Sequence, residues 1–433
     1  MRSASLFTRG PGPGSSGRDM RCTAFGRAGR TDGKSGFVGV KGMNPKWQYR
    51  RIGDVCIVER GGSPRPIESY ITDEPNGINW IKIGDTSDSM FITQTAQRIR
   101  PEGMKKSRYV QPGDFLLSNS MSFGRPYILK IDGCIHDGWL VLRDRDGLFD
   151  KRFLYYYLSA RPTYEKFRLM AVGGVVNNLN SDMVRSVSVP IPDINEQVQI
   201  ADLLDRINKT VSMRKQQLRA FDTLIKARFV EMFGDPVSNP KNWPVRPLLD
   251  MGDCKNGMNF HYDDSGVDLH CLGVGDFQDH SIIADTSMLT MVSLNELPSD
   301  EYMLRDDDIV FVRSNGNKAL VGRCVAVYPG NVPTTFSGFC IRYRKRDMGV
   351  TVPFLLRVLK TDTMRAKMAG RGANIQNLNQ QILGTLIIPV PPLALQEQFS
   401  SFVSQVDKSK SAVQQALDKA QLLFDSLMQE YFG

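Results

Sequence analysis

Two proline-led segments decide the fold: PIPDINEQVQIADLLD at residues 190–205 and PVPPLALQEQF at residues 389–399. In each, a Pro-x-Pro triplet and a Glu-Gln pair precede a long amphipathic run. Proline blocks a helix from continuing upstream, so Pro192 and Pro392 predict helices that begin just after them. Gly234 and Pro236 end the first of these helices.

Apolar residues recur along both runs at alternating steps of three and four, which is coiled-coil spacing. The series are Ile207, Val211, Leu218, Phe221, Ile225 and Met232, with Arg214 at one position, and Val406, Val413, Leu417, Ala420, Phe424, Leu427 and Tyr431, with Lys410 at one position. A helix over residues 197–232 would be about 54 Å long at about 1.5 Å per residue. We expect the two helices to pack antiparallel on each other. The alternative is that each packs only on its own globular part.

The two segments close two copies of one unit, about 199 residues apart. The matches that run in the same order through both copies are Asn44–Trp47 with Asn239–Trp243, Ile83-Gly84-Asp85 with Val274-Gly275-Asp276, Gly124-Arg125 with Gly322-Arg323, Asn178-Leu179-Asn180 with Asn377-Leu378-Asn379, Pro190-Ile191-Pro192 with Pro389-Val390-Pro391, and Glu196-Gln197 with Glu397-Gln398. Within each copy, short apolar runs alternate with Gly, Pro, Asn and Asp, which predicts strands, and a few helical stretches intervene. The expected fold is mixed α/β (α+β) with an internal pseudo-two-fold repeat.

Composition is that of a soluble globular protein, with 41% hydrophobic and 23% charged residues in a chain of 433. We see no apolar run long enough for a membrane span, and the seven cysteines form no CxxC pair, so a reducing cytoplasm fits best. The net charge of the chain is +9. Residues 1–43 contain eight Lys/Arg and two Asp/Glu, so they contribute 8 − 2 = +6 of it. These residues are predicted to be a disordered tail. Two interpretations of this tail remain: a misassigned translation start or passive tail, and a basic arm that binds DNA.

The predicted domain boundaries follow from these patterns. They are 1–43 for the tail, 44–195 and 235–392 for the two globular domains, and 196–234 and 393–433 for the two long helices.

With the repeated Pro-x-Pro and Glu-Gln entry, the GGSPRP segment (residues 61–66) and the two NLN segments, the chain resembles the specificity subunit of type I restriction-modification systems over residues 44–433. The resemblance implies two target recognition domains, each recognising one half of a bipartite gapped DNA site. It implies helices that set the gap and dock two modification subunits. It also implies motor-nuclease restriction subunits as partners, with S-adenosylmethionine, ATP and Mg expected on the partner subunits and no cofactor on this chain.

Polar loops that follow predicted strands are the candidates for DNA contact, because base edges are recognised by Arg, Asn and Gln, and phosphates by Lys, Arg, hydroxyls and backbone amides. In the first copy these candidates are Ser63, Arg65, Lys105, Lys106, Ser118, Asn119, Ser120, Arg125, Asn177 and Asn178. In the second copy they are Arg313, Ser314, Asn315, Asn317, Lys318, Arg323, Arg371, Asn374 and Gln376. Ordinary turns, and for the lysines a solvated face, are the alternatives.

No catalytic motif competes with this interpretation. The NPK segments lack the second proline and the aromatic residue of an adenine methyltransferase motif, and no P-loop is present. The run of carboxylates from Asp306 to Asp308 matches a turn of the first copy, and His261, His270, Cys271 and His280 fit no zinc spacing. We expect no metal site and no catalytic residue. A stand-alone DNA-modifying enzyme and a coiled-coil scaffold without a DNA role remain as alternatives.

Overall fold

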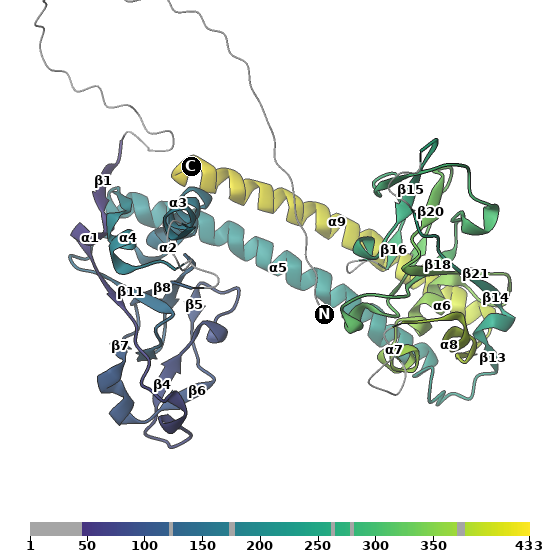
Figure 1. The fold of residues 1–433 in the computed structure, drawn as a ribbon, viewed down its shortest axis with the longest axis horizontal. Coiled ribbons are helices and arrows are strands. Elements are labelled where there is room, and N and C mark those ends of the chain that lie inside the picture. Colours follow the sequence, from purple (N-terminus) through teal and green to yellow (C-terminus); the bar gives the residue numbers. More distant parts are fainter. Residues whose placement is uncertain (1–45, 121–123, 173–177, 261–264, 278–280, 370–376) are drawn as a thin grey trace, which may run out of the picture. The chain divides into compact units, whose positions relative to one another are not determined.

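A computed structural model of the chain describes residues 46–120, 124–172, 178–260, 265–277, 281–369 and 377–433 (Figure 1). The chain divides into residues 1–43 and a unit from Asn44 to Gly433, and the fold below is that of the second unit. Because the described residues begin at residue 46, the predicted basic tail (residues 1–43) lies outside them.

The two long helices are present where the prolines predicted them. α5 spans Ile194–Phe233 and α9 spans Leu393–Phe432, each with 40 residues, or about 60 Å at about 1.5 Å per residue. Asp193 caps α5, and Gly234, with φ of 79°, ends it. No helix among the described residues is both long and apolar enough to cross a membrane.

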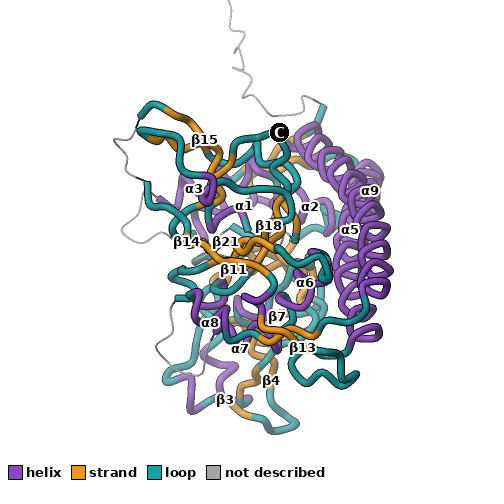
Figure 2. The backbone as a smooth tube through the Cα atoms, turned by 90° about the vertical axis from the view of Figure 1, so that its right-hand side faces the viewer, coloured by secondary structure: helices purple, strands orange, loops and turns teal. Residues whose placement is uncertain are grey.

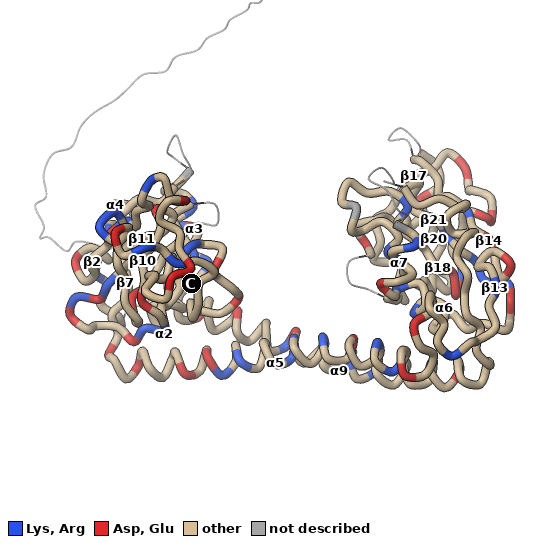
Figure 3. The backbone as a smooth tube through the Cα atoms, turned by 90° about the horizontal axis from the view of Figure 1, so that it is seen from below, with Lys and Arg blue, Asp and Glu red and all other residues tan. Residues whose placement is uncertain are grey.

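α5 and α9 pack side by side (Figure 2) and run antiparallel (Figure 1). Phe229 and Phe233, near the end of α5, contact Phe399 near the start of α9, and Lys410 forms an ion pair with Asp222 further along. Every residue of the two predicted apolar series is buried or half-buried. Charged residues of both signs occur along the two helices (Figure 3). The shared helix pair is therefore confirmed over the alternative of two separately packed helices.

The first domain consists of two five-stranded sheets and a short two-stranded one, in the orders β2-β11-β8-β9-β5, β3-β6-β4-β10-β7 and β1-β12. Its strands are β1 (Gln48–Arg51), β2 (Cys56–Arg60), β3 (Ile71–Thr72), β4 (Ile78–Ile81), β5 (Phe91–Ile92), β6 (Gln97–Ile99), β7 (Arg108–Val110), β8 (Phe115–Ser118), β9 (Pro126–Leu129), β10 (Gly133–Ile135), β11 (Trp139–Asp144) and β12 (Ser188–Ile191). Its helices are α1 (Ile52–Val55), α2 (Lys151–Ser159), α3 (Arg161–Val172) and α4 (Ser181–Ser186).

The second domain repeats this plan with sheets β14-β21-β18-β19-β16, β17-β15-β20 and β13-β22. Its strands are β13 (Val245–Pro247), β14 (Gly252–Asn256), β15 (Val267–Leu272), β16 (Ile282–Ile283), β17 (Met291–Leu294), β18 (Asp308–Val312), β19 (Cys324–Val327), β20 (Thr334–Phe336), β21 (Cys340–Lys345) and β22 (Ile387–Pro389). Its helices are α6 (Val352–Leu359), α7 (Asp362–Ala369) and α8 (Gln380–Gly384). Four of the short apolar runs that predict strands, residues 114–117, 139–142, 308–312 and 339–343, coincide with β8, β11, β18 and β21.

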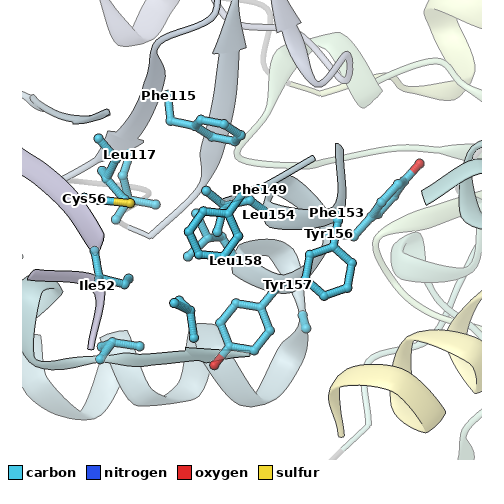
Figure 4. Packing of buried hydrophobic residues seen from close by; sticks show 14 of the residues in the cluster. Ile52, Cys56, Phe115, Leu117, Phe149, Phe153, Leu154, Tyr156, Tyr157 and Leu158 are labelled. Atoms are coloured by element: carbon cyan, nitrogen blue, oxygen red, sulfur yellow. The ribbon is translucent and has the colours of Figure 1, made fainter. Parts of the chain in front are cut away.

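Each domain buries its core against both long helices. In the first domain, α2 contributes Phe153 and Tyr157 to the core shown in Figure 4, and Phe432 of α9 lies edge-on to both, with ring centroids 5.4 and 5.8 Å away. In the second domain, Phe354 of α6 lies against Phe233 of α5. The opposite ends of the helix pair therefore belong to the cores of different domains.

A buried glutamine fastens each helix entry in the same way. Gln197 Nε2 donates to the carbonyls of Leu148 and Pro192, and Gln197 Oε1 accepts from the Asp150 backbone N–H. Gln396 makes the corresponding three hydrogen bonds in the second domain. The structural counterpart of Gln197 is therefore Gln396, and the predicted match of Glu196-Gln197 with Glu397-Gln398 is wrong by two residues. Because both Gln396 and Gln398 lie close to the start of α9, the sequence allows Gln197 to be aligned with either. Only the burial of Gln396 shows which alignment is correct.

Candidate nucleic-acid interface

The loop that follows β8 is anchored by its first two residues. Ser118 and Asn119 are each 1% exposed. Asn119 Nδ2 donates to the Asp137 carbonyl at 2.8 Å, and Ser118 Oγ accepts from the Arg125 backbone N–H at 3.0 Å. In this structure these two side chains form the base of the loop. Ser120 is half-buried and Arg125 is exposed, so these two can meet a ligand.

The loop after β18 is built in the same way with different side chains. Arg313 stands in the place of Asn119, and its Nη1 donates to the Gly338 carbonyl at 3.2 Å. Asn315 Oδ1 accepts from the Asn317 backbone N–H at 2.8 Å, so these amides also shape the loop. Asn317 is exposed, and the other predicted contact residues here, Ser314 and Arg323, are half-buried. The side chain of Lys318 lies outside what the structure describes.

The GGSPRP segment lies directly against this region of the first domain. Ser63 Oγ donates to Asp137 Oδ1 at 2.7 Å, and Arg65, whose side chain is 81% exposed, lies 3.7 Å from Asp137 Oδ2. A Cβ at Gly61 would collide with the carbonyl oxygen of His136, so this close approach requires glycine. In the second domain Gly257 stands equally close to the carbonyl oxygen of Ser337.

The predicted lysine pair is the next neighbour. Lys105 and Lys106 end the short 3-10 helix Pro101–Lys106, and both are exposed. Lys106 Nζ donates to the Tyr70 hydroxyl at 2.9 Å, and the Lys106 carbonyl packs against Gly62. The backbone of the lysine pair therefore lies beside the GGSPRP segment.

The NLN segments complete the cluster and have a clear structural role. Leu179 is buried, and its backbone N–H donates to the Asn119 carbonyl at 2.9 Å. Asn180 caps α4 by accepting from the Met183 backbone N–H, and Asn379 caps α8 in the same way. Asn178 is half-buried. Of the residues predicted nearby, Asn177, Arg371, Asn374 and Gln376 lie outside the described residues.

Residues 136–138, between β10 and β11, link these segments and were not predicted from the sequence. Asp137 receives the Ser63 hydrogen bond, which lowers the pKa of its carboxyl and keeps it ionised. Burial lowers the pKa of the neighbouring His136. A cavity of about 690 Å³ opens here, lined by Ser63, Pro64, Arg65, Pro66, Ile67, Glu68, Trp80, Lys82, His136 and Asp137. No spacing or motif marked this turn, because its place depends on strand pairing.

Four segments distant in sequence thus meet in the first domain: residues 61–65, 118–120 with 124–125, 136–138, and 178–180. Residues 257–258, 313–323, 337–339 and 377–379 meet in the second. Matching segments of the two domains thus bring guanidinium, hydroxyl and amide groups together, and the first domain adds the carboxylate of Asp137. Such groups suit hydrogen bonding to base edges and phosphates.

The acidic run and the described cysteines have structural explanations. Asp308 is buried and accepts two hydrogen bonds from Arg344 at 2.8 Å, so the acidic run Asp306–Asp308 is a braced turn. The six described cysteines are free, and burial raises the pKa of Cys56 to about 12, which disfavours a thiolate. No group of metal-binding side chains occurs within the described ranges, and His261 and His280 fall outside them.

Comparisons with known proteins agree with this arrangement. The family model for the type I restriction modification DNA specificity domain matches twice, at residues 44–220 and 240–421. The type I restriction enzyme StySPI specificity subunit of Salmonella potsdam is 22% identical over 80% of this chain and 78% of its own length. The MjaVIII specificity subunit of Methanocaldococcus jannaschii is 21% identical over 86% and 90%, respectively.

Solved structures share the fold. The crystal structure of a type I restriction-modification S subunit from M. genitalium is 16% identical and has a TM-score of 0.52, covering 90% of this chain and 98% of that one. A chain from a study of complex assembly and conformational transition of the type I system has a TM-score of 0.56 at 16% identity, covering 91% and 99%. Because the family model matches both copies of the unit, the chain belongs to the type I restriction modification DNA specificity domain family.

Proposed function

We propose that this chain is the recognition subunit of a type I restriction-modification complex and that each globular domain recognises one half of a gapped DNA target. The observation that carries the proposal is the repetition of one loop cluster in two domains with different polar side chains. Asn119 and Arg313 occupy the same place, each donating to a carbonyl of the facing turn. Conserved geometry with changed chemistry is what two separate half-sites require. The subunit is not an enzyme by itself, as its relatives are specificity subunits.

The helix pair suits the role of spacer. Its helices have 40 residues each, or about 60 Å at about 1.5 Å per residue, compared with about 34–36 Å for one turn of B-DNA. The opposite ends of the pair are built into the cores of the two domains, so helix length controls the distance between the two loop clusters. An unread gap between the half-sites follows from this length.

Exposed apolar side chains on both helices support docking of further subunits. They are Leu203, Met213, Leu224, Val230, Leu422 and Leu423, of which Leu422 is 69% exposed. Contiguous exposed apolar surface marks protein interfaces, and we assign these side chains to such an interface. We place two modification subunits there, and motor-nuclease subunits beyond them. S-adenosylmethionine, ATP and Mg would be bound by these partners.

The test is substitution within one loop cluster, followed by mapping of adenine methylation in cells that also express the cognate modification subunit. Alanine at Asn315 and Asn317 should change the half-site recognised by the second domain and leave the other half-site intact. Alanine at Ser120 and Arg125 should have the reciprocal effect. An unchanged motif in both variants, with wild-type amounts of folded protein, would contradict the assignment of these loops.

A further inference from the structure

Beside the loop after β18, the second domain contains a cavity of about 240 Å³ with an unusual concentration of positive charge. Its lining is Lys226, Phe277, Gly322, Arg323, Cys324, Val325, Arg357, Lys360, Asp362 and Arg365. Five of these ten residues are cationic and one is acidic. Within the described part of the chain, the lining therefore has a large excess of positive charge.

Three elements hold these cations in place. Arg357 and Lys360 come from α6 and the residue that follows it, Arg365 comes from α7, and Lys226 comes from α5. Arg365 Nη2 donates to the Ala319 carbonyl at 2.8 Å, which fixes this guanidinium to the loop itself. The cavity is thus built from the rigid body of the domain and ends at the recognition loop.

The charges are only partly compensated. The Arg357 guanidinium lies close enough to Asp362 to feel its charge, and Lys360 Nζ donates to Ser281 Oγ at 2.9 Å. The buried Nε of Arg365 has no hydrogen-bond partner among the residues that the structure describes. Burial lowers the pKa of both Arg357 and Lys360, and each of these side chains lies close enough to Asp222 to feel its charge. Crowded cations in a partly desolvated site are costly unless an anion joins them.

The first domain has a cavity at the corresponding Gly-Arg pair, with different chemistry. Gly124 and Gly322 have φ of 79° and 77°, and a Cβ at each would lie 3.3 Å from Phe167 and 3.4 Å from Met368, respectively. An arginine follows each glycine. The first-domain cavity, of about 420 Å³, is lined by Ser87, Asp88, Ser89, Gly124, Arg125, Pro126, Tyr127, Tyr155, Leu158, Ser159 and Tyr164.

At one matching position the first copy has a neutral group where the second has a cation. Ser159 and Lys360 each come nine residues after the residue that caps their helix, Asp150 and Thr351. The first-domain lining includes one cation, Arg125, and one acid. The duplication therefore kept the cavity and concentrated positive charge in one copy.

We infer that the cavity of the second domain binds a phosphate group of the DNA backbone next to the half-site recognised by that domain. This inference rests on the proposed function. Arg323 gives the strongest support for a phosphate site, because this residue lines the cavity and also ends the loop assigned to base recognition. Guanidinium and ammonium groups are the usual partners of phosphate oxygens. The contact adds affinity without sequence preference and fixes the register of the second domain on the duplex.

The experiment uses the full chain and fluorescence anisotropy with duplex DNA over a range of salt concentrations. Each neutralised phosphate contributes about 0.9 to the slope of log affinity against log salt. Lys360→Ser, which introduces the residue of the first copy, and Arg357→Gln should each weaken binding to all duplexes alike and reduce the slope by about 0.9. Ser159→Lys, which adds a cation to the first-domain cavity, should raise the slope by a similar amount. Lys419→Gln is the control, because this exposed lysine lines neither cavity.

The outcomes separate the cavity from the proposed function. A wild-type chain that binds no duplex would contradict the proposed function. Wild-type binding together with Lys360→Ser and Arg357→Gln variants that match Lys419→Gln in affinity and slope would overturn the phosphate site alone. Unchanged DNA binding with weakened association to the modification subunit would also overturn it, because the anion would then belong to a protein partner. Thermal unfolding of each variant confirms that the domain is folded.

Discussion

The buried amide of Gln396 allows a sharp test of how the second domain is joined to α9. Its Nε2 donates to the carbonyls of Gly349 and Pro391 at 3.0 and 2.8 Å, and its Oε1 accepts from the Thr351 backbone N–H at 2.9 Å. The side chain is 0% exposed. Gln396→Ala removes all three hydrogen bonds and leaves one backbone donor and two carbonyls without this partner.

The expected cost follows from these contacts. A hydrogen bond contributes about 1 kcal/mol net, so the substitution should lower the free energy of unfolding by about 3 kcal/mol. For a domain of this size the thermal midpoint should fall by roughly 6–12 °C, at about 2–4 °C per kcal/mol. Gln398→Ala is the matched control. Gln398 is exposed, so its replacement should change stability by at most about 0.5 kcal/mol.

Thermal and urea unfolding, followed by circular dichroism, measure the difference between the two variants. Gln197→Ala should reproduce the loss in the first domain, since Gln197 makes the corresponding hydrogen bonds. Equal stability of the Gln396→Ala and Gln398→Ala proteins would refute the reasoning. It would mean that the amide does not fasten the domain to the helix.

Three further predictions concern the helix pair and the first domain. Phe432→Ala should lower the free energy of unfolding of the first domain by about 3–5 kcal/mol, because Phe432 is 4% exposed and packs on Phe153. Leu422→Ala is the control and should have little effect, since Leu422 is 69% exposed. Equal losses of stability in urea unfolding would contradict this packing. Burial lowers the pKa of His136 below its ordinary value of 6.5, so the unfolded chain binds a proton at this histidine before the folded chain does as the pH falls. The free energy of unfolding should therefore decrease below about pH 6.5. His136→Gln should lessen that decrease when thermal unfolding is compared at neutral and acidic pH. Inserting three heptads at facing positions in the middle of both α5 and α9 lengthens the helix pair by about 32 Å, close to one DNA turn of about 34–36 Å. Methylation mapping should then find a gap about nine base pairs longer between unchanged half-sites. An unaltered gap would exclude the helices as the spacer.

The long helices could be predicted because their signals are local. Prolines before each helix, Gly234 after the first and the three-four apolar spacing are all visible in the sequence. The predicted starts near residues 196 and 393 lie close to the observed Ile194 and Leu393. The antiparallel pairing followed because two narrow apolar seams within one chain can cover each other.

The loop clusters could be predicted only in part. Position in both copies identified the loop after β8 and its counterpart after β18. Burial then divided their residues: Ser118 and Asn119 support the loop, while Arg125 faces outward. Such a division depends on tertiary packing, which local sequence does not reveal. Asp137 was missed for the same reason, since only strand pairing brings it to Ser63.

Methylation mapping of genomic DNA tests the central claim most directly. Cells would express this chain with its cognate modification subunit, and a matched strain would lack only this chain. The account predicts a bipartite, gapped, adenine-methylated motif that disappears when the chain is deleted. An identical methylation pattern in both strains would contradict its role as the determinant of DNA specificity.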